Sequence, residues 1–164
     1  MSYYHTALIC ENGHLLASSL EYAGAKDAPH CERCGARTLS ACANCNAPIR
    51  GGYAHHTQLY GTSYVARYDA PKFCHECGKP YPWTASAVMA WREMAEESEG
   101  LDESEKRRLA ASIDDLVCDT PRTQLAVQRL KQLAPKLGVT VWGGMKEVLV
   151  SVATEAARKG LGLG

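Results

Sequence analysis

The pattern of apolar and polar positions changes once along the chain, near Pro82-Trp83-Thr84. After that point the apolar residues recur every three or four positions, which is typical of amphipathic helices. Before it, short apolar runs such as LLASSLEY alternate with turns rich in Gly and Pro, which favour short strands. We therefore predict an α+β protein, with a small β-rich domain at residues 1–83 and a small helical domain at residues 84–164.

Four helices are predicted in the second half, and their apolar stripes either cover one another or pack on the first half. They span approximately residues 84–98, 102–118, 120–135 and 140–159. Thr84 caps the first helix, and Asp102 with Glu105 makes a capping box for the second. Pro121 takes the first position of the third helix. Gly160 is expected to end the fourth.

The cysteines and histidines indicate a metal-binding first half, because seven of the eight cysteines and all six histidines precede residue 80. They form the motif CENGH and three CxxC pairs. The candidate metal ligands are Cys10, His14, Cys31, Cys34, Cys42, Cys45, Cys74 and Cys77. A CxxC turn brings two thiolates to one ion at roughly 2.3 Å, and Gly after the second Cys permits a positive-φ turn. Four pairs predict two zinc ions per chain, with iron as a minor alternative.

The pairing of these motifs has two solutions. Sequential pairing joins the first pair to the second and the third to the fourth, as in a zinc ribbon. Cross-brace pairing joins the first to the third and the second to the fourth, as in RING-like domains. The segment GARTLSA, residues 35–41, separates the second and third pairs and is long enough for a ribbon's third strand. The loop lengths therefore favour sequential ribbons.

Both predicted sites are structural. Catalytic zinc has three protein ligands and an open position, whereas here four pairs fill two sites. The chain contains no HExxH or GxSxG motif, and His75-Glu76 lies inside a CxxC pair. Cys118 has acidic neighbours, which disfavour a reactive thiolate, so we interpret it as a buried core cysteine. We expect no enzymatic activity, and the sequence identifies no small-molecule substrate.

The histidines outside the predicted ligand set are interpreted as surface or second-shell residues. They are His5, His30, His55, His56 and His75. His30 and His75 each adjoin a ligand cysteine, so they are the first substitutes if a site has been assigned wrongly.

The charge of the chain argues against a nucleic-acid-binding protein. The chain has 18 basic and 18 acidic residues, so its formal net charge is zero. The first half carries +1, and two zinc ions bound through seven thiolates would lower this to about −2. Phosphate binding requires a clustered excess of cations. The first half also holds aromatic residues that either stack on bases or fill a small core: Tyr53, Tyr60, Tyr64 and Tyr68.

The start of the chain, MSYYHTALICENGH, has no basic and apolar signal pattern, and no stretch is apolar enough for a membrane span. We therefore expect a cytoplasmic protein without membrane contact. In that compartment cysteines hold metal more often than disulfides, and four disulfides in a secreted chain are the minor alternative.

Three segments carry a resemblance: ALICENGH, HCERCGARTLSACANCNAPIRGGY and APKFCHECGKPYPWT. Together with the DTPRT segment of the helical tail, they resemble an uncharacterised bacterial family of double zinc-ribbon proteins, a domain of unknown function. The resemblance covers nearly the whole chain and implies bacterial origin and zinc binding by the eight ligands above. Ala43 departs from the Pro that is usual after the first Cys of the third pair, which leaves coordination untouched.

These observations favour a non-catalytic zinc-binding adaptor, in which the ribbons form a scaffold and the helices bind a protein partner or a second copy. Two alternatives stay open. One is a nucleic-acid-binding zinc ribbon. The other is a RING-like cross-brace that assists a conjugating enzyme.

Overall fold

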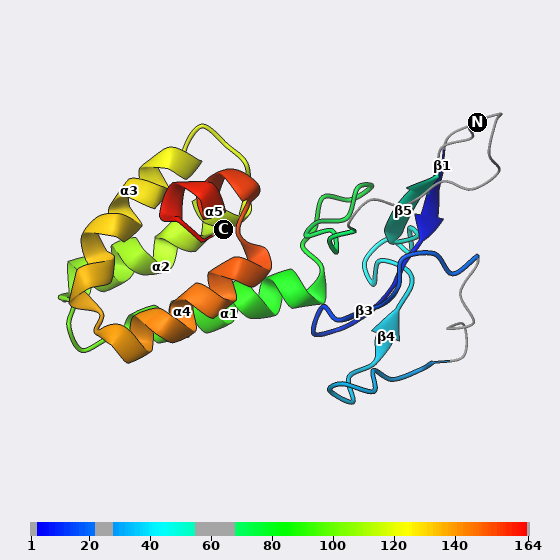
Figure 1. Ribbon diagram of the computed structural model, residues 1–164, viewed down its shortest axis with the longest axis horizontal. Coiled ribbons are helices and arrows are strands. Elements are labelled where there is room, and N and C mark those ends of the chain that lie inside the picture. The colour runs from blue at the N-terminus through cyan, green and yellow to red at the C-terminus, as the bar shows by residue number, and fades with distance from the viewer. Residues whose placement is uncertain (1–2, 22–27, 55–67, 164) are drawn as a thin grey trace. The chain divides into compact units, whose positions relative to one another are not determined.

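The chain forms two compact units in the computed structural model, Met1–Thr84 and Ala85–Gly164, and residues 3–21, 28–54 and 68–163 are described (Figure 1). Small antiparallel sheets occupy the first unit and helices the second. The predicted α+β class is therefore confirmed. That the two halves are independent domains stays a prediction. His55, His56, Tyr60 and Tyr64 lie outside the described residues.

Short strands form two sheets in the first unit. The strands are β1 (Tyr3–Thr6), β2 (Leu8–Cys10), β3 (Leu15–Ala17), β4 (Thr38–Leu39) and β5 (Arg50–Ala54). One sheet pairs β1 with β5, and the other has the order β3-β2-β4, all antiparallel. β4 lies within residues 35–41, where the spacing predicts a ribbon's third strand.

The backbone around β5 comes very close to its neighbours. The amide of Gly52 donates to the carbonyl of Ser18 at 2.7 Å, and the amide of Ala7 donates to the carbonyl of Ile49 at 2.9 Å. A Cβ atom added at Gly51 would lie 2.1 Å from the Ser18 carbonyl oxygen. Gly51 is therefore required by this approach of backbone to backbone.

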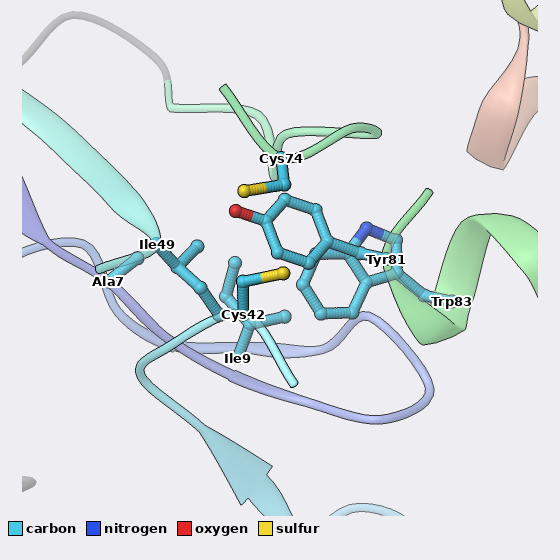
Figure 2. Close-up of a cluster of buried hydrophobic side chains, with 7 residues drawn as sticks. All are labelled: Ala7, Ile9, Cys42, Ile49, Cys74, Tyr81 and Trp83. Atoms are coloured by element: carbon cyan, nitrogen blue, oxygen red, sulfur yellow. The ribbon is translucent and has the colours of Figure 1, made fainter. Parts of the chain in front are cut away.

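The core of the first unit is small and includes candidate metal ligands (Figure 2). Its buried members are Ala7, Ile9, Cys42, Ile49, Cys74, Tyr81 and Trp83. So few apolar side chains bury little surface, so a fold of this kind needs additional cross-links for stability.

The second unit is helical and has a larger apolar core. Its helices are α1 (Pro82–Glu96, which starts in the first unit), α2 (Glu103–Val117), α3 (Thr123–Leu133), α4 (Val139–Val152) and α5 (Glu155–Leu161), with a 3₁₀ turn at Ala134–Lys136 after α3. The fully buried side chains include Trp91, Leu109, Ile113, Leu116, Leu130, Met145 and Leu149. The Trp91 indole N–H donates to the Leu109 carbonyl at 2.9 Å, so its polar atom is satisfied in the core.

The start of α2 confirms the predicted capping box. The Asp102 side chain accepts from the amides of Ser104 and Glu105, and the Glu105 carboxylate accepts from the Asp102 amide. Two other predicted helix starts were wrong. α1 begins at Pro82, two residues before Thr84. α3 begins at Thr123, because the Thr123 hydroxyl donates to the Cys118 carbonyl and holds residues 118–122 in a turn.

The predicted fourth helix is two helices, so the described residues of the second unit form five α-helices. Ala153 and Thr154 are extended between α4 and α5, and the Thr154 side chain caps α5 by accepting from the Ala157 amide. Gly160 lies inside α5, against Val127 on α3, and Gly162 is the residue that ends α5. Among the described helices, none is long and apolar enough to cross a membrane.

Candidate metal centres

Each CxxC pair lies in the same tight turn, which we call a knuckle. In every knuckle the amide of the first cysteine donates to the carbonyl five residues later, at 2.8 Å. The residue after the second cysteine donates to the carbonyl of the first, and its φ is positive: 72° at Gly35, 60° at Asn46 and 70° at Gly78. Asn46 replaces Gly because Asn tolerates the left-handed region better than most side chains.

The CENGH turn forms a fourth knuckle of different shape. The Cys10 amide donates to the His14 carbonyl at 3.0 Å, and the Gly13 amide donates to the Cys10 carbonyl at 2.8 Å. Gly13 has φ 83°, and a Cβ added there would lie 3.0 Å from Trp83 Cβ. The Asn-Gly step therefore supplies the turn, as predicted, and also lets this knuckle rest against Trp83.

The structure brings the eight predicted ligands together in two groups. The first group is Cys10, His14, Cys31 and Cys34, and the second is Cys42, Cys45, Cys74 and Cys77. Within each group the ligand atoms lie within 4.8 Å of one another. We call these groups cluster 1 and cluster 2. The grouping is sequential, so the cross-brace arrangement is not the one that this chain adopts.

The distances inside both clusters match tetrahedral metal coordination. A tetrahedron with metal–sulfur bonds of about 2.3 Å has sulfur–sulfur edges of about 3.8 Å. Cys10 and Cys34 Sγ are 3.8 Å apart in cluster 1, and Cys42 and Cys77 Sγ are 3.8 Å apart in cluster 2. A disulfide requires an S–S distance of about 2.05 Å. These cysteines are therefore free thiols, spaced to share an ion.

Two further ligand pairs have distances that fit the same coordination. Cys45 and Cys74 Sγ are 3.6 Å apart. In cluster 1, Cys31 Sγ lies 3.6 Å from His14 Nδ1, close to the edge of about 3.6 Å that a metal–sulfur and a metal–imidazole bond enclose. Cluster 1 therefore offers three thiolates and an imidazole, and cluster 2 offers four thiolates. Such soft donor sets suit a metal such as zinc.

Backbone amides favour the thiolate form of several ligands. The Ala36 amide, assisted by the Asn12 side chain, lowers the pKa of the Cys34 thiol to about 6. The amides of Cys77 and Glu76 lower the pKa of Cys74 to about 6. Amide hydrogen bonds stabilise negative sulfur, so these turns prepare ligands for a cation.

The crowding of four thiols in cluster 2 has the opposite effect and raises the pKa of one ligand. The Ala47 amide lowers the pKa of Cys45, but desolvation and the thiols of Cys74, Cys77 and Cys42 outweigh it and raise that pKa to about 12. Four thiolates this close repel one another, and a divalent cation removes the repulsion. The donor chemistry of cluster 2 thus fits a bound metal ion.

The other candidate residues lie outside both clusters. His5, predicted at the surface or next to the ligands, is instead 5% exposed, and its Nδ1 atom lies 3.2 Å from a carboxylate oxygen of Glu21. His30 and His75 are exposed and belong to neither cluster. Cys118, predicted in the core, is half-buried at the C-cap of α2.

Sequence reasoning missed Tyr81. Its side chain is 2% exposed and lies in the core of the first unit, with its hydroxyl beside the Cys74 sulfur (Figure 2). Burial and then the negative charge of Cys74 raise the pKa of Tyr81, so the hydroxyl is a potential donor to that sulfur. The available signal was the segment KPYPW, directly after the last knuckle, where two prolines hold an aromatic residue next to a ligand turn.

Two four-ligand clusters on small antiparallel sheets define a double zinc-ribbon-like protein. Residues 3–161 match a family model described as "Uncharacterized protein conserved in bacteria (DUF2321)". The chain therefore belongs to that family, which confirms the resemblance seen in its motifs. No curated protein and no solved structure matches the chain.

Proposed function

We propose that this protein is a non-catalytic zinc-binding adaptor. Zinc ions in clusters 1 and 2 act as structural cross-links, and the helical unit binds a protein partner. The observation that carries the proposal is that each cluster supplies four protein donors at tetrahedral spacing. Four protein ligands leave no open coordination position for water or substrate, which is the arrangement of structural zinc.

The small core of the first unit supports the structural role. Cys42 and Cys74 belong both to that core and to cluster 2. An ion held there joins two knuckles that are far apart in sequence, and structural zinc contributes on the order of 10 kcal/mol of folding free energy per site. Zinc would thereby replace the apolar contacts that the first unit lacks.

Two exposed valines on one side of α4 support the adaptor role. Val139, Gly143, Lys146 and Val150 are spaced by three or four residues, so they share one face of the helix. Val139 is 91% exposed and Val150 is 49% exposed, whereas Met145 and Leu149 on the other side are buried. A Cβ added at Gly143 would meet open space. Packing against the described residues therefore does not require glycine at this position, although glycine costs about 1 kcal/mol of helix stability.

The double variant V139E/V150K tests this role. Glu in the first turn and Lys in the last turn complement the helix dipole, so the variant should fold. Ser151→Lys is the control, because it adds a charge to a different exposed position of α4. We expect a protein that co-purifies with the wild type and the control, or a dimer mass in native mass spectrometry, to be lost in V139E/V150K. Equal behaviour of all three proteins would contradict the adaptor role.

One observation favours a second function, nucleic-acid binding. Tyr4 and Tyr53 form a cross-strand pair with ring centroids 4.9 Å apart, and the Arg50 guanidinium lies 4.8 Å from the centre of the Tyr4 ring. Tyr4 is 51% exposed and Tyr53 36% exposed, so the pair offers a stacking surface beside a cation. The low charge of the first half weighs against it. Absence of salt-sensitive retention on an oligonucleotide column would exclude this function.

A further inference from the structure

The two clusters differ in what surrounds their buried sulfurs. In cluster 1 the donors belong to the two ligand turns themselves: Asn12 Nδ2 lies 3.5 Å from Cys34 Sγ, the His14 amide lies 3.3 Å from Cys10 Sγ, and the Ala36 amide donates to Cys34. In cluster 2 a buried side chain approaches from the core. Tyr81 lies against Cys74 and Cys42, whose sulfurs point toward it (Figure 2).

The position of the Tyr81 ring is fixed by its neighbours. It stacks on Trp83, with centroids 4.7 Å apart and planes at 15°. The Tyr81 amide donates to the Lys72 carbonyl at 3.0 Å, and the Trp83 indole N–H donates to the Pro71 carbonyl at 2.9 Å. Pro80 and Pro82 restrict the backbone on either side of Tyr81. The ring is therefore held in one place, with its hydroxyl on the side of the Cys74 sulfur (Figure 2).

The chemical effect of this contact follows from the nature of the donor. A hydroxyl that donates to a thiolate draws electron density from sulfur, so the sulfur becomes less basic and less nucleophilic. It also adds a donor on the core side of a sulfur that already accepts from the amides of Cys77 and Glu76. Outer contacts of this kind orient metal ligands and tune the bound ion.

We propose that Tyr81 is a positioning residue for the metal ion of cluster 2, through a hydrogen bond from its hydroxyl to Cys74 Sγ. This contact makes cluster 2 the tighter and less reactive of the two metal sites. The inference rests on the proposed metal binding and goes beyond it, because it assigns unequal affinities to the two sites and names the side chain responsible.

Tyr81→Phe tests the proposal, because it deletes the hydroxyl and keeps the stacked ring. Tyr68→Phe is the matched control. Tyr68 packs against the same core, but its hydroxyl donates to the Arg50 carbonyl at 2.6 Å and not to a sulfur. The full-length proteins are loaded with two ¹¹³Cd ions, and NMR separates an ion bound by four thiolates from one bound by three thiolates and an imidazole. A chelator competition then measures the zinc affinity of each site.

We expect Tyr81→Phe to move the four-thiolate cadmium signal alone and to weaken zinc binding at one site by about 10–100-fold, the usual effect of losing an outer-shell partner. Tyr68→Phe should move neither signal. Unchanged signals and affinity in Tyr81→Phe would overturn the inference, and so would an equal loss in Tyr68→Phe, since packing alone would then explain it. A wild-type chain that takes up no metal would overturn the proposed zinc function itself, whereas a metal-replete wild type with an unchanged variant would overturn only the role of Tyr81.

Discussion

Single backbone positions decide whether the knuckles can form. Gly13 and Gly35 both have positive φ values, 83° and 72°. They differ in their surroundings, because a Cβ at Gly35 would meet open space and a Cβ at Gly13 would lie 3.0 Å from Trp83 Cβ. The need for a left-handed residue after each Cys pair is visible in the sequence. The contact with Trp83 is not, since it depends on how distant segments pack.

The pair Gly13→Ala and Gly35→Ala separates these two effects. A left-handed conformation costs Ala roughly 1–2 kcal/mol at either position. Gly13→Ala should lose about 1–3 kcal/mol more, the usual cost of overpacking a core. The denaturant concentration at which zinc is released, followed with a chromogenic chelator, measures the difference. Equal shifts in the two variants would show that Trp83 does not hold the first knuckle.

At the scale of elements, the sequence predicts those features that contacts between neighbouring residues determine. The capping box of α2 and the three CxxC knuckles satisfy their hydrogen bonds within a few residues, and both were predicted. The break between α4 and α5 was not predicted. The Thr154 amide donates to the carbonyl of Leu116 at the end of α2, 2.9 Å away, so a contact with another helix fixes the break. Gly160 was predicted to end a helix. It lies inside α5 instead, where it packs against Val127, a residue distant in sequence.

The capping box gives a prediction for the helical unit. Asp102→Ala removes the acceptor for the amides of Ser104 and Glu105, and we expect it to lower the free energy of unfolding of this unit by about 1 kcal/mol. Urea unfolding followed by circular dichroism at the helix band measures the change. Asp119→Ala, at an exposed acid that follows α2, is the control and should have a smaller effect. A loss in the control as large as in Asp102→Ala would argue against the cap.

At the scale of the whole molecule, the two units draw on different sources of stability. In the described part of the first unit, seven buried residues form one core cluster, and two of them are ligands of cluster 2. The second unit buries large side chains from each of α1 to α4 and holds no candidate metal cluster in its described part. The ligand set could be predicted because CxxC spacing encodes its own geometry. The position of Tyr81 could not be predicted, because it depends on packing against core residues that are distant in sequence, such as Ile9 and Ile49.

Metal removal should therefore affect the two units differently. A strong chelator should unfold residues 1–84, since the knuckles of each cluster then lose the metal ion that joins them and the small core opens. Most of the helical signal should persist, because it comes from residues 85–164. Limited proteolysis with mass spectrometry should place the new cleavage sites in the first unit. Protection of both units after complete metal removal would contradict this division, and cleavage throughout the chain would show that the helices depend on the zinc unit.

The central claim is that two closed structural zinc sites organise this protein. Native mass spectrometry of full-length protein purified without chelator tests it most directly, because the method reads the identity and number of bound metal ions together. We predict two zinc ions per chain, and loss of one ion when Cys45, in cluster 2, is replaced by Ser. A wild-type chain that carries one zinc ion, no zinc or a different metal would contradict the account.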